Sequence, residues 1–328
     1  MTFLYVVIGL TLVFDFINGF HDSANSIAAV VSTKVLSPLS AVAMAAFFNF
    51  IAFTVFPLNV AHTIGGKVVN PDIINLTVIG AALVAAITWN LVTWWLGLPS
   101  SSSHTLVGGL VGAAVASSGF GAVNLAGVML IVMFIFIAPL LGMVLSFILS
   151  SGIMWLFRKL SPSAVDKYFR RFQLVSASAF SLGHGGNDAQ KSMGIIWAAL
   201  IVSGLATKKD PIALWIILSC QTSIALGTLF GGWRIVKTMG QRITKLKPFE
   251  GFCAETAGSI TLFMATHFGI PVSTTHTITG AIIGVGARKG ASAVKWGVTT
   301  KIFWAWILTI PVSGVIGGIM YLIFNWIS

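Results

Sequence analysis

The chain has 328 residues, of which 56% are hydrophobic and only 8% are charged. Because soluble domains carry about 25% charged residues, this composition excludes an ordinary soluble protein. Lys and Arg number 19 against eight Asp and Glu, which gives a formal net charge of +11. A nucleic-acid-binding domain displays such an excess on a polar surface, and this chain has too little polar sequence to build one. We therefore expect a lipid bilayer as its surroundings, basic loops beside the membrane, and no nucleic-acid partner.

Apolar stretches follow one another along the chain, each near the 20 residues that a helix needs to cross about 30 Å of hydrocarbon. The first covers residues 2–20 and continues to Thr33, with Asp15, Asp22 and Asn25 in its middle. Such a segment is too long for one straight crossing and predicts a helix broken inside the membrane. The other apolar segments are residues 39–58, 73–97, 124–157, 172–203, 211–232, 252–269 and 296–325, and two segments rich in Ser, Thr and Gly are residues 99–118 and 271–287.

An internal repeat is clearest in these two hydroxyl-rich segments. Residues 99–112 (PSSSSHTLVGGLVG) match residues 271–284 (PVSTTHTITGAIIG), with six of fourteen positions identical. The surroundings of Asp22 match those of Asp188 in the same way. A frame of Pro, Ser, His, Thr and Gly is not a chance similarity between apolar helices, so we infer a duplication. The predicted units are a first transmembrane repeat at residues 1–157, a basic cytoplasmic link at 158–171 and a second repeat at 172–328.

The basic residues predict an orientation, because cytoplasmic loops carry an excess of Lys and Arg. The link at residues 158–171 and the loop at 233–247 hold five bases each, whereas the loop at 59–72 holds one. We place the first two inside and the third outside. Five crossings in each half, counting the hydroxyl-rich segments, invert the second repeat relative to the first and put both termini outside. The predicted fold is thus an all-α polytopic membrane protein of two inverted repeats, with broken helices or helical hairpins at the midplane replacing some crossings.

Acidic residues inside apolar segments are costly unless they are paired or hydrated, and four are present: Asp15, Asp22, Asp188 and Glu255. Asp22 and Asp188 occupy the same place in the two repeats, close to Asn25 and Asn187. Two symmetric carboxylates with amide oxygens nearby suit a proton or a hard monovalent cation. The alternative is structural, since an Asp near a break can cap a half-helix.

The repeated hydroxyl-rich motifs predict an anion site. Pro99 and Pro271 suit a first helical turn, so the hydroxyls behind them gather at helix N-termini, which attract anions. The alternative is that Ser, Thr and Gly only pack helices together and that the two histidines are packing residues. The candidate anion ligands are Ser102, Ser103, His104, Thr105, Thr274, Thr275, His276 and Thr277.

Two residues break the symmetry of the repeat. Lys191 stands where the first half has Asn25, three residues after Asp188 and thus on the same helical face. It acts either as an intramembrane counter-ion that fills a cation site or as a contact for an anionic substrate. Glu255 has no acidic counterpart, because Leu83 occupies the matching position. It either carries a proton or pairs with a base at a loop end.

The two Asp-centred motifs, the two Pro…Ser-x-x-His-Thr motifs and the segment GFCAE at residues 251–255 together resemble the inorganic phosphate transporter family over essentially the whole chain. The resemblance implies a transporter rather than an enzyme, without a cofactor, which carries phosphate with a proton or a sodium ion by alternating access. It also implies a homodimer in the plasma or inner membrane. His21 and Lys191 depart from the family pattern in the way that bacterial members do.

By this resemblance the transport-essential acids are Asp22 and Asp188, with Asn25 and Asn187 beside them. Sodium is expected at Asp22, Asn25 and Asp188, and phosphate, free or as a metal complex, between the two hydroxyl-rich tips. A sulfate or other oxyanion carrier and a passive anion channel are the alternatives. An intramembrane Ser-His-Asp hydrolase is disfavoured, because no Gly-x-Ser-x-Gly motif is present.

Overall fold

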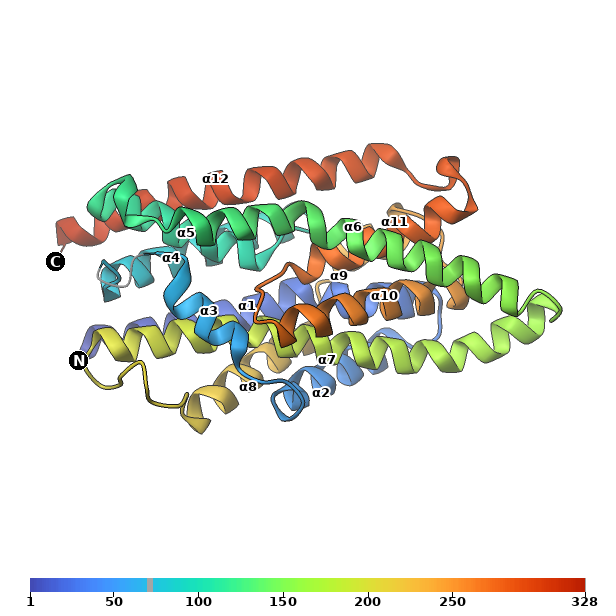
Figure 1. Ribbon diagram of the computed structural model, residues 1–328, viewed down its shortest axis with the longest axis horizontal. Coiled ribbons are helices and arrows are strands. Elements are labelled where there is room, and N and C mark those ends of the chain that lie inside the picture. Colours follow the sequence, from blue (N-terminus) through green and yellow to red (C-terminus); the bar gives the residue numbers. More distant parts are fainter. Residues whose placement is uncertain (70–72, 328) are drawn as a thin grey trace.

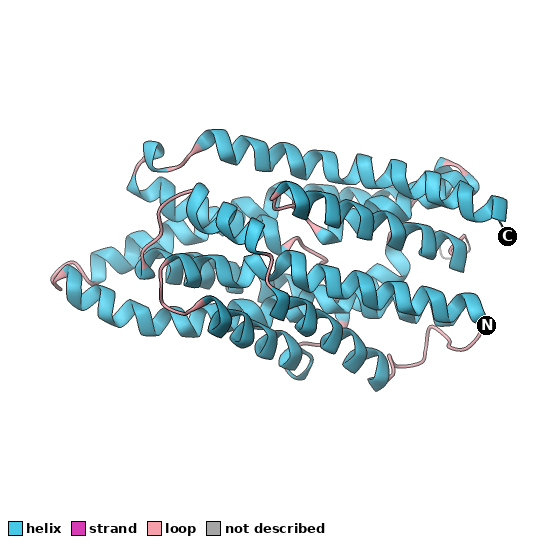
Figure 2. Ribbon diagram, turned by 180° about the vertical axis from the view of Figure 1, so that it is seen from behind, coloured by secondary structure: helices cyan, strands magenta, loops and turns pink. Residues whose placement is uncertain are grey.

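Long helices lying side by side build the whole described part of the computed structural model, residues 1–69 and 73–327, and no strand occurs in it (Figure 1, Figure 2). Asp72, which belongs to the predicted outer loop, lies outside this part. The helices are α1 (Thr2–Ser32), α2 (Pro38–Ile51), α3 (Asn59–Lys67), α4 (Leu76–Leu96), α5 (Ser102–Ser118), α6 (Leu125–Leu156), α7 (Pro162–Val202), α8 (Leu214–Phe230), α9 (Trp233–Lys237), α10 (Pro248–His267), α11 (Thr274–Lys289) and α12 (Trp296–Ile327).

Four of the described helices, α1, α4, α6 and α12, are long and apolar enough to cross a membrane. A fifth span results if α8 and the following helical segment Trp233–Arg242, bent by 60° relative to it, are counted together. The most apolar parts of α6 and α12 have only 22% and 17% of their residues buried. These two helices therefore lie at the periphery, where apolar side chains face lipid. The expectation of an all-α polytopic membrane protein is confirmed.

The predicted break in the first helix is wrong, because α1 is one continuous helix of 31 residues. It spans about 46 Å at 1.5 Å per residue, so it is longer than the hydrocarbon core. The polar residues His21, Asp22 and Asn25 do not interrupt the helix, because they are buried against other helices that supply hydrogen-bond partners. Ser102 on α5, for example, donates to Asp22. Tertiary contacts replace the solvation that a break would otherwise provide.

The two hydroxyl-rich segments are the return arms of helical hairpins, which is the alternative to full crossings that the sequence left open. With 17 and 16 residues, α5 and α11 are shorter than the helices that qualify as spans. They follow α4 and α10 after short turns, the first of which begins at Gly97 with a φ of 66°. Figure 1 shows the turn of the α10–α11 hairpin in the middle of the bundle. The α4–α5 turn meets it there, because the rings of His104 and His276 lie 4.8 Å apart.

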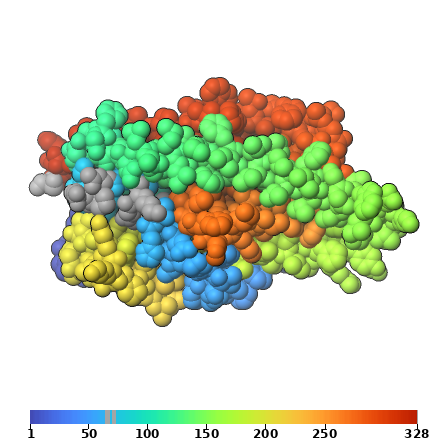
Figure 3. Space-filling view, viewed as in Figure 1, coloured from blue at the N-terminus to red at the C-terminus, as the bar shows by residue number. Residues whose placement is uncertain are grey.

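Each hairpin packs against the last helix of the other half. On α5, a Cβ at Gly108 or Gly112 would overlap the backbone of α12, and on α11 a Cβ at Gly280 or Gly284 would overlap the backbone of α6. These glycines therefore allow close helix approach, as small residues do in membrane bundles. Figure 3 shows the α10–α11 hairpin in orange, between α6 and the α2–α3 segment.

The two chain ends lie at the same end of the bundle, and the junction of α6 and α7 lies at the opposite end (Figure 1). The basic link between the halves is mostly helical, since α7 already begins at Pro162. Ser161 caps this helix by accepting a hydrogen bond from the Ala164 N–H at 3.3 Å. Three of the five bases of the link, Lys167, Arg170 and Arg171, are thus held on the first turns of α7 at one extremity of the molecule.

Candidate functional site

The tips of the two hairpins have the same local structure. Ser101 caps α5 and accepts from the His104 N–H at 3.3 Å, and Ser273 caps α11 and accepts from the His276 N–H at 3.2 Å. Each proline therefore lies two residues before its cap, rather than in the first helical turn as predicted. The first turns of both helices, residues 102–105 and 274–277, are at most 5% exposed. Two buried, hydroxyl-rich helix N-termini thus face the middle of the molecule.

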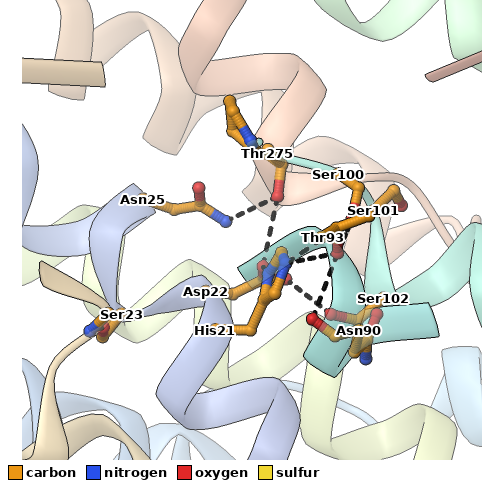
Figure 4. Close-up of polar contacts among 12 residues, drawn as sticks. His21, Asp22, Ser23, Asn25, Asn90, Thr93, Ser100, Ser101, Ser102 and Thr275 are labelled. Carbon is orange, nitrogen blue, oxygen red and sulfur yellow. Dashed lines mark hydrogen bonds and ion pairs between the residues drawn. The ribbon is translucent and has the colours of Figure 1, made fainter. Parts of the chain in front are cut away.

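Asp22, on α1, accepts a hydrogen bond from one hydroxyl of each hairpin (Figure 4). The Ser102 Oγ lies 3.2 Å from its Oδ2, and the Thr275 Oγ1 lies 3.4 Å from its Oδ1. The Nδ1 of its neighbour His21 lies 2.6 Å from the same Oδ1. His21 Nε2 is in turn 3.1 Å from Thr93 Oγ1. Asp22 is 2% exposed, and its carboxylate is held by protein groups from three helices, α1, α5 and α11.

Asp188, on α7, occupies the corresponding place in the second half. Its Oδ2 accepts from the Thr274 Oγ1 at 3.0 Å and lies 3.2 Å from His184 Nε2. Its Oδ1 is ion-paired with Lys191 Nζ, as their spacing on one helical face predicted. Lys191 also donates to Ser103 Oγ and, at 3.0 Å, to the Val272 carbonyl. The lysine is 1% exposed, so its charge is enclosed within the site.

The contacts of the two halves follow one pattern. Each aspartate accepts from the first hydroxyl of its own hairpin, Ser102 or Thr274. The residue three positions later donates to the second hydroxyl of the opposite hairpin. Asn25 does so to Thr275 at 2.9 Å, and Lys191 does so to Ser103. Asn25 also donates to Thr274 at 3.2 Å. Lys191 thus has the same geometric role as Asn25 but brings a positive charge.

The two aspartates lie close enough to share a cation. One ligand atom from each of Asp22, His184 and Asp188 lies within 4.8 Å of the others, and all three residues are buried. The amide oxygen of Asn25 has no hydrogen-bond partner among the described residues. Sequence reasoning missed His184, although its place four residues before Asp188 puts both on one helical face. It also missed Thr93, which no motif marked.

Other predicted residues lie near the tips but contact different groups. Thr105 donates to Asn90 Oδ1 at 3.1 Å and to its own helix, and Thr277 donates to the Ser273 carbonyl at 2.9 Å. The rings of His104 and His276 contact each other, and His276 stacks on Trp306 at 4.0 Å. These contacts hold the hairpin tips together and against α12. They favour the packing interpretation of the two histidines.

Asn187 and Glu255 point to neighbours other than the aspartate pair. Asn187 donates to Thr266 Oγ1 at 3.0 Å. Glu255, on α10 and 0% exposed, accepts from Ser176 at 2.6 Å and from Gln173 at 3.3 Å. Within the part of the chain that the structure describes, Glu255 pairs with no base, so the alternative of a loop-end partner is not realised. Whether either residue serves cation coupling stays a prediction.

Apolar helices here enclose a central, buried cluster of carboxylates and hydroxyls that can bind ions. This arrangement is typical of membrane transport proteins. The sequence pattern of the family described as "Phosphate transporter family" matches residues 18–317. The chain belongs to this family, whose members are named for transport rather than catalysis, and it is not an enzyme. The predicted resemblance is confirmed.

Relatives and a solved structure agree with this membership. A "probable low-affinity inorganic phosphate transporter" of Rhizobium meliloti (strain 1021) is 56% identical over 315 residues, 96% of this chain and 94% of that protein. A protein of the same name from Bacillus subtilis (strain 168) is 44% identical and is covered to 98%. The solved structure "The sodium-dependent phosphate transporter" superposes with a TM-score of 0.92 at 25% identity, and both chains are covered completely.

Proposed function

We propose that this protein carries inorganic phosphate across a membrane together with a proton or a sodium ion, by alternating access. The observation that carries the proposal is the meeting of two hydroxyl-rich helix N-termini with Asp22, Asp188 and Lys191 in one buried cluster. The phosphate would lie between the tips, at Ser102 and Ser103 of one hairpin and Thr274 and Thr275 of the other. It would travel free or as a metal complex.

The charges of the site require a co-transported cation. Two carboxylates and one ammonium group leave a net negative charge before phosphate, itself an anion, arrives. The dipoles and free N–H groups of two helix N-termini favour the anion by only about 0.3–1 kcal/mol each at exposed sites and up to about 2 kcal/mol when partly buried. A cation at Asp22, Asn25 and Asp188 would neutralise the remaining repulsion. Phosphate and cation would therefore bind together more tightly than either alone.

The hairpins provide the elements that would move. Each helix that carries an aspartate, α1 or α7, contacts both hairpins, and the hairpins belong to different halves. We propose that the halves are inverted repeats and that release of one hairpin opens the site to one side, while release of the other opens it to the opposite side. The resemblance to the family supports a homodimer in the plasma or inner membrane, with both termini outside.

Uptake into proteoliposomes tests the proposal. Labelled phosphate and labelled sulfate are offered separately under an imposed proton gradient and an imposed sodium gradient. Phosphate accumulation above the external concentration under one gradient supports the proposal and identifies the coupling ion. Equilibration without accumulation under both gradients identifies a passive channel and overturns it. Preference for sulfate over phosphate overturns the assignment of the anion.

A further inference from the structure

A second buried acid, Asp15, lies on α1 seven residues before Asp22, or about 10 Å along the helix. It is 0% exposed, and neither of its carboxylate oxygens has a hydrogen-bond partner among residues 1–69 and 73–327. The other intramembrane acids, Asp22, Asp188 and Glu255, all have such partners. Among the described residues, no group therefore donates a hydrogen bond to Asp15 or forms an ion pair with it.

Two neutral polar side chains lie close to this carboxylate, one on α1 and one on α7, and α8, which packs on α1, carries a third. Asn18 and Ser192 lie near enough to interact with Asp15 electrostatically, although not in hydrogen-bond geometry. Gln221 is placed by the packing of α1 on α8, in which Gly19 abuts the backbone of Ile224. The helices run in the same direction, since Ser223 donates to the Leu12 carbonyl and Thr228 to the Gly19 carbonyl. Asp15 and Gln221 each lie one turn before that Gly19–Ile224 contact.

The polar atoms of this cluster are unsatisfied to an unusual degree. Asn18, Ser192 and Gln221 are 0–1% exposed. A buried polar atom without a partner costs about 1–3 kcal/mol, and more if it is charged. Among the described residues, no hydrogen-bond partner exists for Asp15 Oδ1 and Oδ2, Asn18 Oδ1, Ser192 Oγ, and Gln221 Oε1 and Nε2.

We propose that Asp15, Asn18, Ser192 and Gln221 form a further binding site for a monovalent cation of the sodium class, distinct from the site at Asp22 and Asp188. The unpartnered atoms include five oxygens, the ligands that hard cations take. One carboxylate with three neutral oxygen donors carries a single negative charge, which matches a monovalent ion. The bound ion satisfies the acid that the described protein groups leave unpaired.

The site has a consequence for the central cluster. Ser192 directly follows Lys191, and the charges of both Lys191 and Asp188 act on Asp15. A cation at Asp15 therefore repels the Lys191 ammonium and attracts the Asp188 carboxylate. Asp15 also lies between Asp22 and the end of the bundle that holds both termini (Figure 1). A cation that enters from that end meets Asp15 before the central site.

The test measures the unfolding temperature of the purified full-length protein in detergent without phosphate, while NaCl replaces choline chloride at constant ionic strength. The Asp22→Asn variant removes one carboxylate of the central site and isolates the Asp15 site. We expect sodium to stabilise this variant by about 2 °C at ten times its dissociation constant. Adding Asp15→Asn should abolish the shift, and adding Gln221→Leu should raise the sodium concentration at its midpoint at least severalfold.

Equal stabilisation with and without the Asp15 carboxylate overturns the proposal, as does a lack of any sodium response in the Asp22→Asn variant. If the double aspartate variant does not fold, Ser192→Ala in the Asp22→Asn background takes its place, because it removes a single hydroxyl. An unchanged sodium midpoint there overturns the proposal. Because the readout involves neither phosphate nor transport, a failure of the proposed transport function leaves this result unaffected and is recognised separately in the uptake assay.

Discussion

Lys191, on α7 of the second half, donates a hydrogen bond to Ser103 at the tip of the first hairpin. Asn25, on α1 of the first half, makes the reciprocal contact with Thr275 of the second hairpin. Each half therefore holds the hairpin of the other. The two contacts differ in charge, because only Lys191 is cationic. The site thus has a symmetric frame and an asymmetric electrostatic field.

The two central carboxylates are expected to be needed for transport. Asp22→Asn and Asp188→Asn each keep the side-chain volume but remove the charge that would hold the coupled cation. We expect proteoliposome uptake of labelled phosphate to fall at least about tenfold, which corresponds to a loss of about 1.4 kcal/mol. The control is Asp166→Asn, whose carboxylate is 45% exposed and pairs with Arg170. Unchanged uptake in both central variants would remove the carboxylates from the mechanism.

The ion pair of Lys191 and Asp188 is expected to show strong coupling in a double-mutant cycle. Both residues are 1% exposed, and breaking a buried pair by removing one partner costs about 3–5 kcal/mol. Lys191→Met should therefore lower the unfolding free energy by this amount. Adding Asp188→Asn to Lys191→Met should recover part of the loss, with a coupling energy above about 1 kcal/mol. Denaturant unfolding in detergent measures all four proteins, and additive effects would show that the pair is not a unit.

The packing of α5 on α12 is expected to depend on glycine. A Cβ at Gly112 would overlap the backbone of Gly314, so Gly112→Ala should lower the unfolding free energy by about 1–3 kcal/mol. Gly9, on α1, has open space around it, and Gly9→Ala should be neutral or stabilising by up to about 1 kcal/mol. Thermal unfolding compares the two variants. Equal effects would mean that helix propensity, not close approach, decides the outcome.

The orientation of the bundle is expected to follow the basic residues. The protein's own cysteines, Cys220 and Cys253, are both 0% exposed, so an introduced cysteine is read against a low background. Ser163→Cys marks the end with the α6–α7 junction, and Ser118→Cys marks the C-terminus of α5. Both serines are exposed. In intact cells we expect a membrane-impermeant maleimide to label Ser118→Cys and not Ser163→Cys, and the reverse pattern would invert the predicted topology.

The candidate site was largely predictable because the chain carries its motifs twice. Asp22 and Asp188, and the hydroxyls from Ser102 to Thr105 and from Thr274 to Thr277, stand out as repeated polar positions in apolar sequence. A polar side chain in apolar surroundings costs free energy, so its position stands out in the sequence as a candidate for the site. His184 was missed because one histidine within a single repeat has no matching partner to draw attention to it. The contacts that join the hairpins to α1 and α7 cross up to 253 residues, and no local pattern encodes such pairings.

The sequence by itself determined that the protein is an apolar helical bundle with a duplicated polar motif, because composition and periodic repetition are local properties of the chain. Only the tertiary structure decided that α1 is unbroken and that the hydroxyl-rich segments are hairpin arms rather than crossings. It also decided that each half holds the opposite hairpin. The physical reason is that a buried polar group must find a partner, and whether it breaks its helix or keeps it depends on which side chains distant parts of the chain bring to it.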